Sequence, residues 1–145
     1  AEQVAIRLRR VKKKAKSVYI HISYSKIESK KSINASKKIN PTQSTKQLTD
    51  HVLSLFRSKY DGGAVRSIAV RYDNLIDDNL TIYTLFDDIE AIEKQRKIDK
   101  TLDTIRDKYG FLSVQNGSML MEGSRVKERS KLVGGHAGGM DGIIW

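Results

Sequence analysis

The chain has no cysteine among its 145 residues and only one proline. The lack of cysteine excludes disulfides, a thiolate nucleophile and cysteine-ligated zinc, and it suits a reducing compartment. No stretch approaches the roughly 20 apolar residues that a membrane-spanning helix needs, and the first residues form a charged amphipathic segment rather than a signal peptide. We therefore expect no membrane partner and a cytoplasmic location. Because the chain opens on Ala1 and its first residues already look helical, we treat it as a fragment of a longer protein.

Positive charge is what the chain has in excess. It carries 27 Lys and Arg against 17 Asp and Glu, a formal net charge of +10. Such a balance predicts an anionic partner, of which nucleic acid is the commonest, although a merely solvated basic surface has the same composition. With 39% apolar residues, the chain has enough material for one modest core.

Apolar periodicity predicts the order helix, strand, strand, helix, strand over the first half of the chain. The first helix is expected over residues 2–15, with an apolar stripe of Val4, Leu8, Val11 and Ala15 inside a basic segment. Strands are expected over residues 17–24, 32–40 and 65–72. Pro41 is expected to break the sheet, and Ser44 or Thr45 to cap a second helix that ends near Tyr60, before the turn Asp61-Gly62-Gly63.

This order predicts an α+β fold, a ferredoxin-like βαββαβ unit whose first strand would lie upstream of Ala1. Both helices are expected on one face of the sheet. The core would then join sheet residues to helix residues: Val18, Ile20, Ile22, Ile33, Ile68 and Val70 with Val4, Leu8, Leu48, Val52 and Phe56. The other face would be open and would carry Tyr19, His21, Ser23, Asn34, Ser36, Lys38, Ser67 and Arg71. Hydroxyl, amide and basic donors of this kind match phosphate oxygens without demanding a base sequence.

The second half of the chain predicts a long helix and a tail. Asp87 and Asp88 suit a helix start, an apolar stripe follows at Ile89, Ile92, Ile98, Leu102, Ile105 and Tyr109, and Gly110 is expected to end the helix. Beyond Phe111 the chain is basic and rich in glycine, so we expect a flexible tail. We divide the chain into residues 1–76, 77–110 and 111–145.

No catalytic or metal-binding pattern is legible. His21, His51 and His136 lack ligand spacing, and the pairs Asp77-Asp78 and Asp87-Asp88 are more typical of strand neighbours and helix caps than of a magnesium site. The glycine-rich run over residues 134–139 lacks the Lys-Ser/Thr of a phosphate loop. We therefore predict no catalytic residue, no metal and no cofactor in this chain.

Several short strings follow one another in a characteristic order. They are Val4-Ala5-Ile6-Arg7-Leu8-Arg9-Arg10, residues 16–24 ending on Tyr24-Ser25, Pro41-Thr42, residues 65–72 (Val-Arg-Ser-Ile-Ala-Val-Arg-Tyr), residues 94–110 from Lys94 to Tyr109-Gly110, Ser124-Arg125, residues 128–131 and Gly134-Gly135-His136. Together they resemble the C-terminal region of Y-family lesion-bypass DNA polymerases of the UmuC/DinB type, and of their Gram-positive UmuC-like branch in particular.

The resemblance implies a little-finger domain, which in this family lies along the primer-template duplex and chiefly touches backbone phosphates during bypass of DNA damage in the SOS response. The catalytic carboxylates and magnesium belong to a separate palm, so a parent DNA-directed polymerase would use magnesium while this chain would not. We predict DNA contacts from Arg10, Lys12, Lys13, Tyr19, His21, Lys30, Lys31, Ser32, Asn34, Ser36, Lys38, Arg66, Ser67 and Arg71.

The family also carries a sliding-clamp peptide after the little finger, commonly Gln-Leu-Ser/Asp-Leu-Phe. The matching positions here are Ile82, Tyr83, Thr84, Leu85 and Phe86. The Leu-Phe anchor is kept, but Ile82 replaces the glutamine, and losing such a polar anchor costs about 1 to 3 kcal/mol. Ile82, Tyr83, Leu85 and Phe86 therefore either contact a sliding clamp weakly or pack on the domain.

Two other interpretations stand beside DNA binding. Ferredoxin-like folds often stack RNA bases on exposed sheet aromatics, for which Tyr19 is the clear candidate here. The segment around Phe86 and the long helix could instead form an arm that docks on a protein partner. An unpaired strand edge at the place of the missing strand would favour dimerisation, and the oligomeric state stays open.

Overall fold

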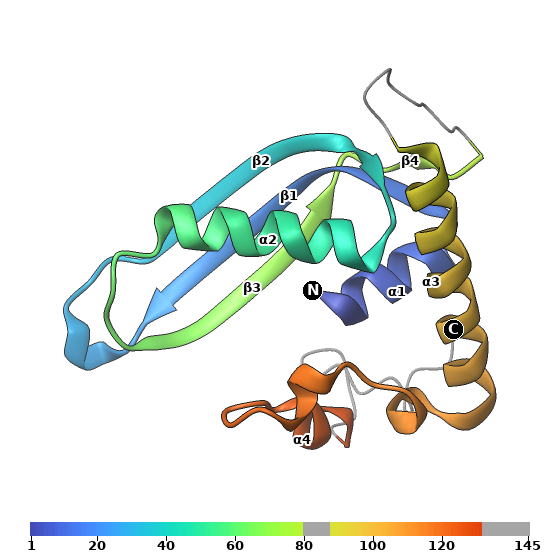
Figure 1. Ribbon diagram of the computed structural model, residues 1–145. Helices are drawn as coiled ribbons and strands as arrows, with labels where there is room; N and C mark the ends of the chain where they lie inside the picture. Colours follow the sequence, from blue (N-terminus) through green and yellow to red (C-terminus); the bar gives the residue numbers. More distant parts are fainter. Residues whose placement is uncertain (80–87, 132–145) are drawn as a thin grey trace. The chain divides into compact units, whose positions relative to one another are not determined.

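A computed structural model describes residues 1–79 and 88–131 of the chain (Figure 1). The chain divides into two compact units, residues 1–89 and 90–145, which are described separately. The predicted α+β class is confirmed, since an antiparallel sheet and helices both occur. The three-part division into residues 1–76, 77–110 and 111–145 rests on function and stays a prediction.

The first unit has the predicted order of helices and strands. Its elements are α1 (Glu2–Arg10), β1 (Lys13–Tyr24), the 3-10 helix η1 (Lys26–Glu28), β2 (Ile33–Thr42), α2 (Thr45–Lys59), β3 (Val65–Asp73) and the short β4 (Ile76–Asp77). Ser44 caps α2 as expected, because its side-chain hydroxyl accepts a hydrogen bond from the backbone N–H of Gln47. Gly62 and Gly63 follow α2 with φ of 97° and 99°, the left-handed backbone that glycine adopts without strain.

The first helix is shorter than predicted. It ends at Arg10, Lys12 takes a left-handed φ of 54°, and the strand begins at Lys13. Ala15 is fully buried, but as a strand residue opposite Thr42, while Val11 is half exposed. The spacing of Val11 and Ala15 suits a helix, yet pairing of this segment with β2 and β4 outweighs that local preference.

β1 lies at the centre of the sheet, whose order is β2-β1-β3 with antiparallel pairing on both sides. β2 and β3 are therefore parallel to each other and are joined by α2, with β1 filling the gap between them. Pro41 does not end the sheet as predicted. The register shifts from Ser17 opposite Lys38 to Ala15 opposite Thr42, and this bulge accommodates the proline within an edge strand. The predicted first strand has no counterpart among the described residues.

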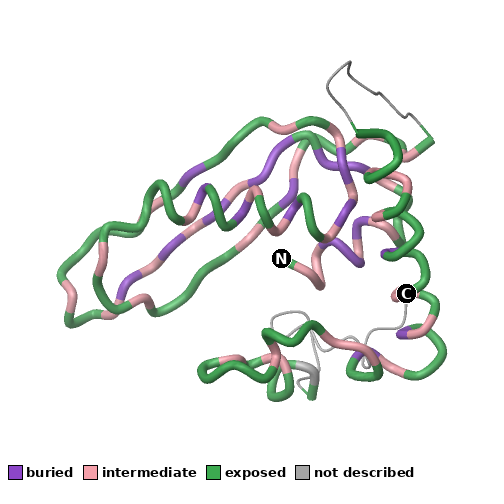
Figure 2. Tube along the Cα trace, viewed as in Figure 1, coloured by how far each residue is buried: buried purple, intermediate pink, exposed green. Residues whose placement is uncertain are grey.

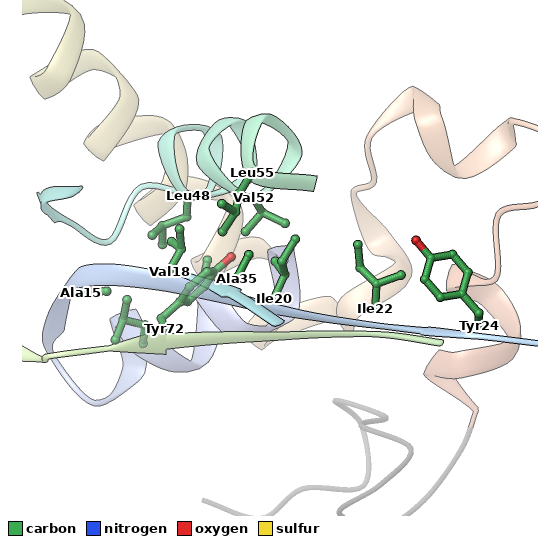
Figure 3. Packing of buried hydrophobic residues seen from close by; sticks show 12 residues of the cluster. Ala15, Val18, Ile20, Ile22, Tyr24, Ala35, Leu48, Val52, Leu55 and Tyr72 are labelled. Atoms are coloured by element: carbon green, nitrogen blue, oxygen red, sulfur yellow. The ribbon is translucent and has the colours of Figure 1, made fainter. Parts of the chain in front are cut away.

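One face of the sheet carries the core. Val18, Ile20 and Ile22 of β1 are fully buried and belong to one apolar cluster with Leu48, Val52 and Leu55 of α2 and with Ala5 and Leu8 of α1. Figure 3 shows the α2 side chains directly over Val18, Ala35 and Ile20, and the buried segments follow β1 in Figure 2. The prediction was wrong for Ile68, which points to this face but stays 48% exposed because it lies on the edge strand β3.

The second unit contains α3 (Ile89–Tyr109), the 3-10 helices η2 (Phe111–Ser113) and η3 (Gly117–Leu120), and α4 (Val126–Ser130). The long helix begins and ends where predicted, and Gly110 follows it with a φ of 97°. Its predicted apolar stripe is partly wrong. Asp99 and Arg106 are the buried residues, whereas Ile98 and Tyr109 are exposed.

Contacts with the chain that follows α3 compensate for the burial of the Arg106 guanidinium. Its Nε and Nη2 atoms donate to the Val114 carbonyl at 3.1 and 3.0 Å, and its guanidinium lies over the Phe111 ring. These contacts hold the chain after α3 against the end of the helix. The glycines of the predicted flexible tail, from Gly134 to Gly139, lie outside the described residues. α3 is the longest helix described, and neither it nor any other described helix offers an apolar span of membrane length.

The central position of β1 predicts a steep stability penalty there. Ile20→Ala removes buried methyl groups between the sheet and α2, so the free energy of unfolding should fall by about 2 to 5 kcal/mol. Urea unfolding followed by circular dichroism measures the change. Ile27→Ala is the control, because Ile27 is 92% exposed and its truncation should change stability by less than about 0.5 kcal/mol. Similar losses in the two variants would contradict this account of the core.

Candidate nucleic-acid interface

The face of the sheet opposite the core is polar, as predicted. Strand register groups its side chains into rows across the sheet: Tyr19 lies between Ser36 of β2 and Arg71 of β3, His21 lies between Asn34 and Ala69, and Ser23 lies beside Ser67. Residues of β2 and β3 on this face are exposed and those of the central β1 are half-buried. The face is open because α1 and α2 both pack on the other side.

Hydrogen bonds link the middle of this open face. The Tyr19 hydroxyl donates to Oδ1 of Asn34 at 2.5 Å, and Nδ1 of His21 lies 2.6 Å from the same oxygen. The hydroxyls of Ser23 and Ser67 also hydrogen-bond to each other across β1 and β3. Three strands therefore present one connected polar surface.

Arg71 is held in place by two neighbours. Its guanidinium lies over the Tyr19 ring, 4.2 Å from the centroid, and its Nε donates to both carboxylate oxygens of Asp73 at 2.8 and 3.0 Å. The Arg71 side chain is nevertheless 62% exposed. Asp73 was not among the predicted site residues, although it lies two positions after Arg71 on a strand, where side chains share a face.

The remaining predicted cations lie at the two ends of the sheet. Arg10, Lys12 and Lys13 surround the turn from α1 into β1, while Lys30, Lys31 and Arg66, together with the neutral Ser32, lie near the opposite end, where η1 leads into β2 (Figure 1). A strand of 12 residues spans roughly 36 to 40 Å, which separates the two groups. Within the strands, Lys38 and Arg71 are the predicted cations of the open face. The structure thus places two of the predicted cations on the polar face and the others near its two ends.

Some of these cations have structural partners. Lys13 forms an ion pair with Asp77, and Lys30 donates to the Gly62 carbonyl at 2.8 Å and to Asp61 at 3.2 Å. Lys14, part of the basic segment noted in the sequence, is buried. Arg9 donates to the Gln43 carbonyl and the Thr45 hydroxyl and so ties α1 to the start of α2. The basic segment is therefore partly structural, which its composition did not reveal.

The hydrogen bond between Lys30 and Asp61 joins two opposite charges and is therefore also an ion pair. It raises the pKa of the Lys30 ammonium and, from the other side, lowers the pKa of the Asp61 carboxyl. Burial and the neighbouring Asp61 raise the pKa of the Tyr24 hydroxyl, which donates to Asp61 at 3.3 Å. Three residues far apart in the sequence thus join the two loops at this end of the sheet.

The Asp77-Asp78 pair does not have the arrangement of a magnesium site. The Asp77 carboxylate pairs with Lys13, and Asp78 accepts from the Gln43 side-chain amide at 3.4 Å. Within residues 1–79 and 88–131, no three His, Asp or Glu side chains form a group that could hold a metal ion. Asp87 and the predicted clamp residues Ile82, Tyr83, Leu85 and Phe86 lie outside the described residues, as does His136.

The ion pair at the loops predicts a pH dependence of stability. Because folding lowers the pKa of Asp61, its contribution is present above the unfolded value near pH 4 and is lost as the pH falls through the folded value. The difference in Tm between the natural chain and Asp61→Asn should therefore be constant above about pH 5 and shrink below about pH 4. Thermal unfolding across this range measures it. In a Lys30→Met background the same difference should no longer shrink, and persistence there would contradict the assignment to Lys30.

Comparison with known proteins finds one family model, which covers nearly all of the first unit, and relatives whose similarity extends into the second unit. Residues 1–85 match the family model described as the impB/mucB/samB family C-terminal domain. A protein of Bacillus subtilis (strain 168) named "Putative UV-damage repair protein UvrX" is 34% identical over 136 residues, which cover 93% of this chain and 32% of the relative. A protein of Halalkalibacterium halodurans named "DNA polymerase IV 2" is 26% identical with the same coverage of both chains.

A second protein named "DNA polymerase IV 2", from Bacillus subtilis (strain 168), is 28% identical over 96 residues, or 66% of this chain and 23% of the relative. The chain thus spans about a third or less of the length of these curated relatives. No solved structure matches the chain.

Proposed function

Because the chain belongs to the impB/mucB/samB family and its residues 1–85 form that family's C-terminal domain, we propose that the open face of the sheet binds the phosphate backbone of duplex DNA. The family predicted from the short sequence strings, the C-terminal region of Y-family lesion-bypass polymerases, is confirmed. In the longer protein the chain would hold the primer-template duplex while catalysis, with magnesium, takes place in other parts.

The main support for this proposal is the open face, because its hydrogen-bond donors suit phosphate oxygens. Lys38 and Arg71 bring positive charge, and Ser36, Ser67 and Asn34 bring neutral donors. Contacts of these kinds fix a protein on the duplex and carry no sequence information directly. Binding should therefore tolerate any base sequence, as a domain that follows a moving primer end requires.

The length of the sheet supports a duplex as the ligand. β1 extends over roughly 36 to 40 Å, and one turn of B-DNA measures about 34 to 36 Å. The cations at its two ends are therefore spaced to contact phosphates about one helical turn apart. Lys12 and Lys31, which are both exposed, belong to these opposite end groups.

The arrangement of Tyr19 argues against an RNA-binding module. Recognition of single-stranded RNA on such a sheet relies on aromatic rings on which bases stack. Tyr19 is the one Phe, Tyr or Trp among the predicted open-face positions, and Arg71 already lies over its ring. A base would have to displace that guanidinium and break its ion pair with Asp73.

Contact with a sliding clamp through Leu85 and Phe86 is a separate proposal that rests on the resemblance alone. It predicts that Phe86→Ala reduces retention of the chain on an immobilised clamp while DNA affinity stays unchanged. A pull-down and a DNA titration on the same preparation measure the two. Undiminished retention would contradict the clamp contact, and Ile27→Ala supplies a matched loss of an apolar side chain on an exposed site.

Two neighbouring lysines test DNA binding. Lys38 pairs with Ser17 and faces the open side, while Lys37 pairs with Val18 and faces the side of α2. Lys38→Ala should weaken binding to a duplex of about two helical turns and reduce the slope of log K against log salt by about 1. Fluorescence anisotropy at several salt concentrations measures both quantities.

Lys37→Ala removes the same charge from the same strand and should leave the slope almost unchanged. The side that Lys37 faces is also evident from His51 of α2, since burial and the nearby Lys37 lower the His51 pKa. Equal losses in the two variants, or binding that is insensitive to salt, would overturn the assignment of the open face. Competition with single-stranded RNA distinguishes the alternative, because an RNA-binding module would release the duplex.

A further inference from the structure

His21 occupies a distinctive place on the open face, because Nδ1 of its ring is hydrogen-bonded to Oδ1 of Asn34, an oxygen that can only accept. We propose that His21 is a proton-dependent phosphate ligand, which donates from Nε2 to a DNA phosphate only when the imidazole is protonated. The chain would then bind DNA more tightly in mild acid than at neutral pH. This inference rests on the proposed binding of DNA by the open face.

The hydrogen bond to Asn34 determines where the first imidazole hydrogen lies. Nδ1 of His21 is 2.6 Å from Oδ1 of Asn34. A carboxamide oxygen accepts and cannot donate, so Nδ1 must carry the hydrogen of the neutral ring. Nε2 of the neutral ring then holds a lone pair and repels an anionic oxygen. Protonation adds the second hydrogen of the ring, which lies on Nε2, and Nε2 of the charged ring becomes a donor.

Tyr19 strengthens this arrangement from the other side of Asn34. Its hydroxyl donates to the same Oδ1 at 2.5 Å, so this oxygen accepts from two side chains. In the described part of the chain, the Nδ2 amide of Asn34 donates to no acceptor. Asn34 therefore offers a neutral donor beside the His21 ring, and the two together form a site for one phosphate group.

The charges around His21 favour an anion at this position. On its own strand the titratable neighbour is Tyr19; β2 contributes Lys38, and β3 contributes Arg71 and Asp73. Ala69 lies directly opposite His21 on β3 and carries no charge. Arg71 lies in the next row, opposite Tyr19, and its ion pair with Asp73 offsets part of its charge. Lys38 lies one row further along β1, opposite Ser17, and adds positive charge to the same face. A phosphate bound here would favour the protonated imidazole, so DNA binding and proton uptake support each other.

The three histidines of the chain provide a matched test. DNA affinity of the 145-residue chain is measured by anisotropy at about pH 5.5 and about pH 7.5, the range in which histidine ordinarily changes charge, at constant ionic strength. The natural chain should bind about fivefold more tightly at the lower pH, and its salt slope should steepen by about 0.9, the value of one added phosphate contact. His21→Gln should abolish both differences.

His51→Gln and His136→Gln serve as controls and should keep the pH dependence of the natural chain. His51 lies on α2, on the side of the sheet away from the proposed DNA site. A His21→Gln variant that keeps the pH dependence, or a control that loses it, would overturn the role of His21. If Lys38→Ala still weakens binding in that case, DNA binding by the open face stands. A chain that binds DNA at neither pH would overturn both proposals.

Discussion

Every other part of the first unit depends on the pairing of β1 with a strand on each side. β1 gives one set of alternate side chains to the core, where Val18, Ile20 and Ile22 are fully buried, and the other set to the polar face. A slip of one residue in its register would exchange the two sets. The register with β2 and β3 therefore determines both which residues stabilise the fold and which residues form the polar face.

Much of this fold is legible in the sequence because the alternation of period two in β1 is regular and α2 has a clear cap at Ser44. The errors occur where local preference and tertiary pairing disagree. Ala15 continues the helical spacing of α1, yet it pairs with Thr42 in the sheet. In α3, the burial of Arg106 depends on the Val114 carbonyl and the Phe111 ring, which no apolar periodicity predicts.

The candidate site was also predictable only in part from the sequence. The membership of the open face follows from strand period alone, and Tyr19, Asn34 and Arg71 lie where that period puts them. The partners of the cations do not follow from it. Lys30 reaches Asp61 across 31 positions of the chain, so its ion pair requires knowledge of how the two loops meet. Net charge likewise predicts an anionic partner but not that most of the predicted cations lie near the two ends of the polar face.

The position of Arg71 between Tyr19 and Asp73 has an entropic consequence. A free arginine side chain loses up to about 2 kcal/mol of rotamer freedom when a ligand orders it. In this chain the ring and the carboxylate already restrict the guanidinium before any ligand arrives. Its contact with a phosphate would therefore keep more of its gross interaction energy than one made by an untethered lysine at either end of the sheet.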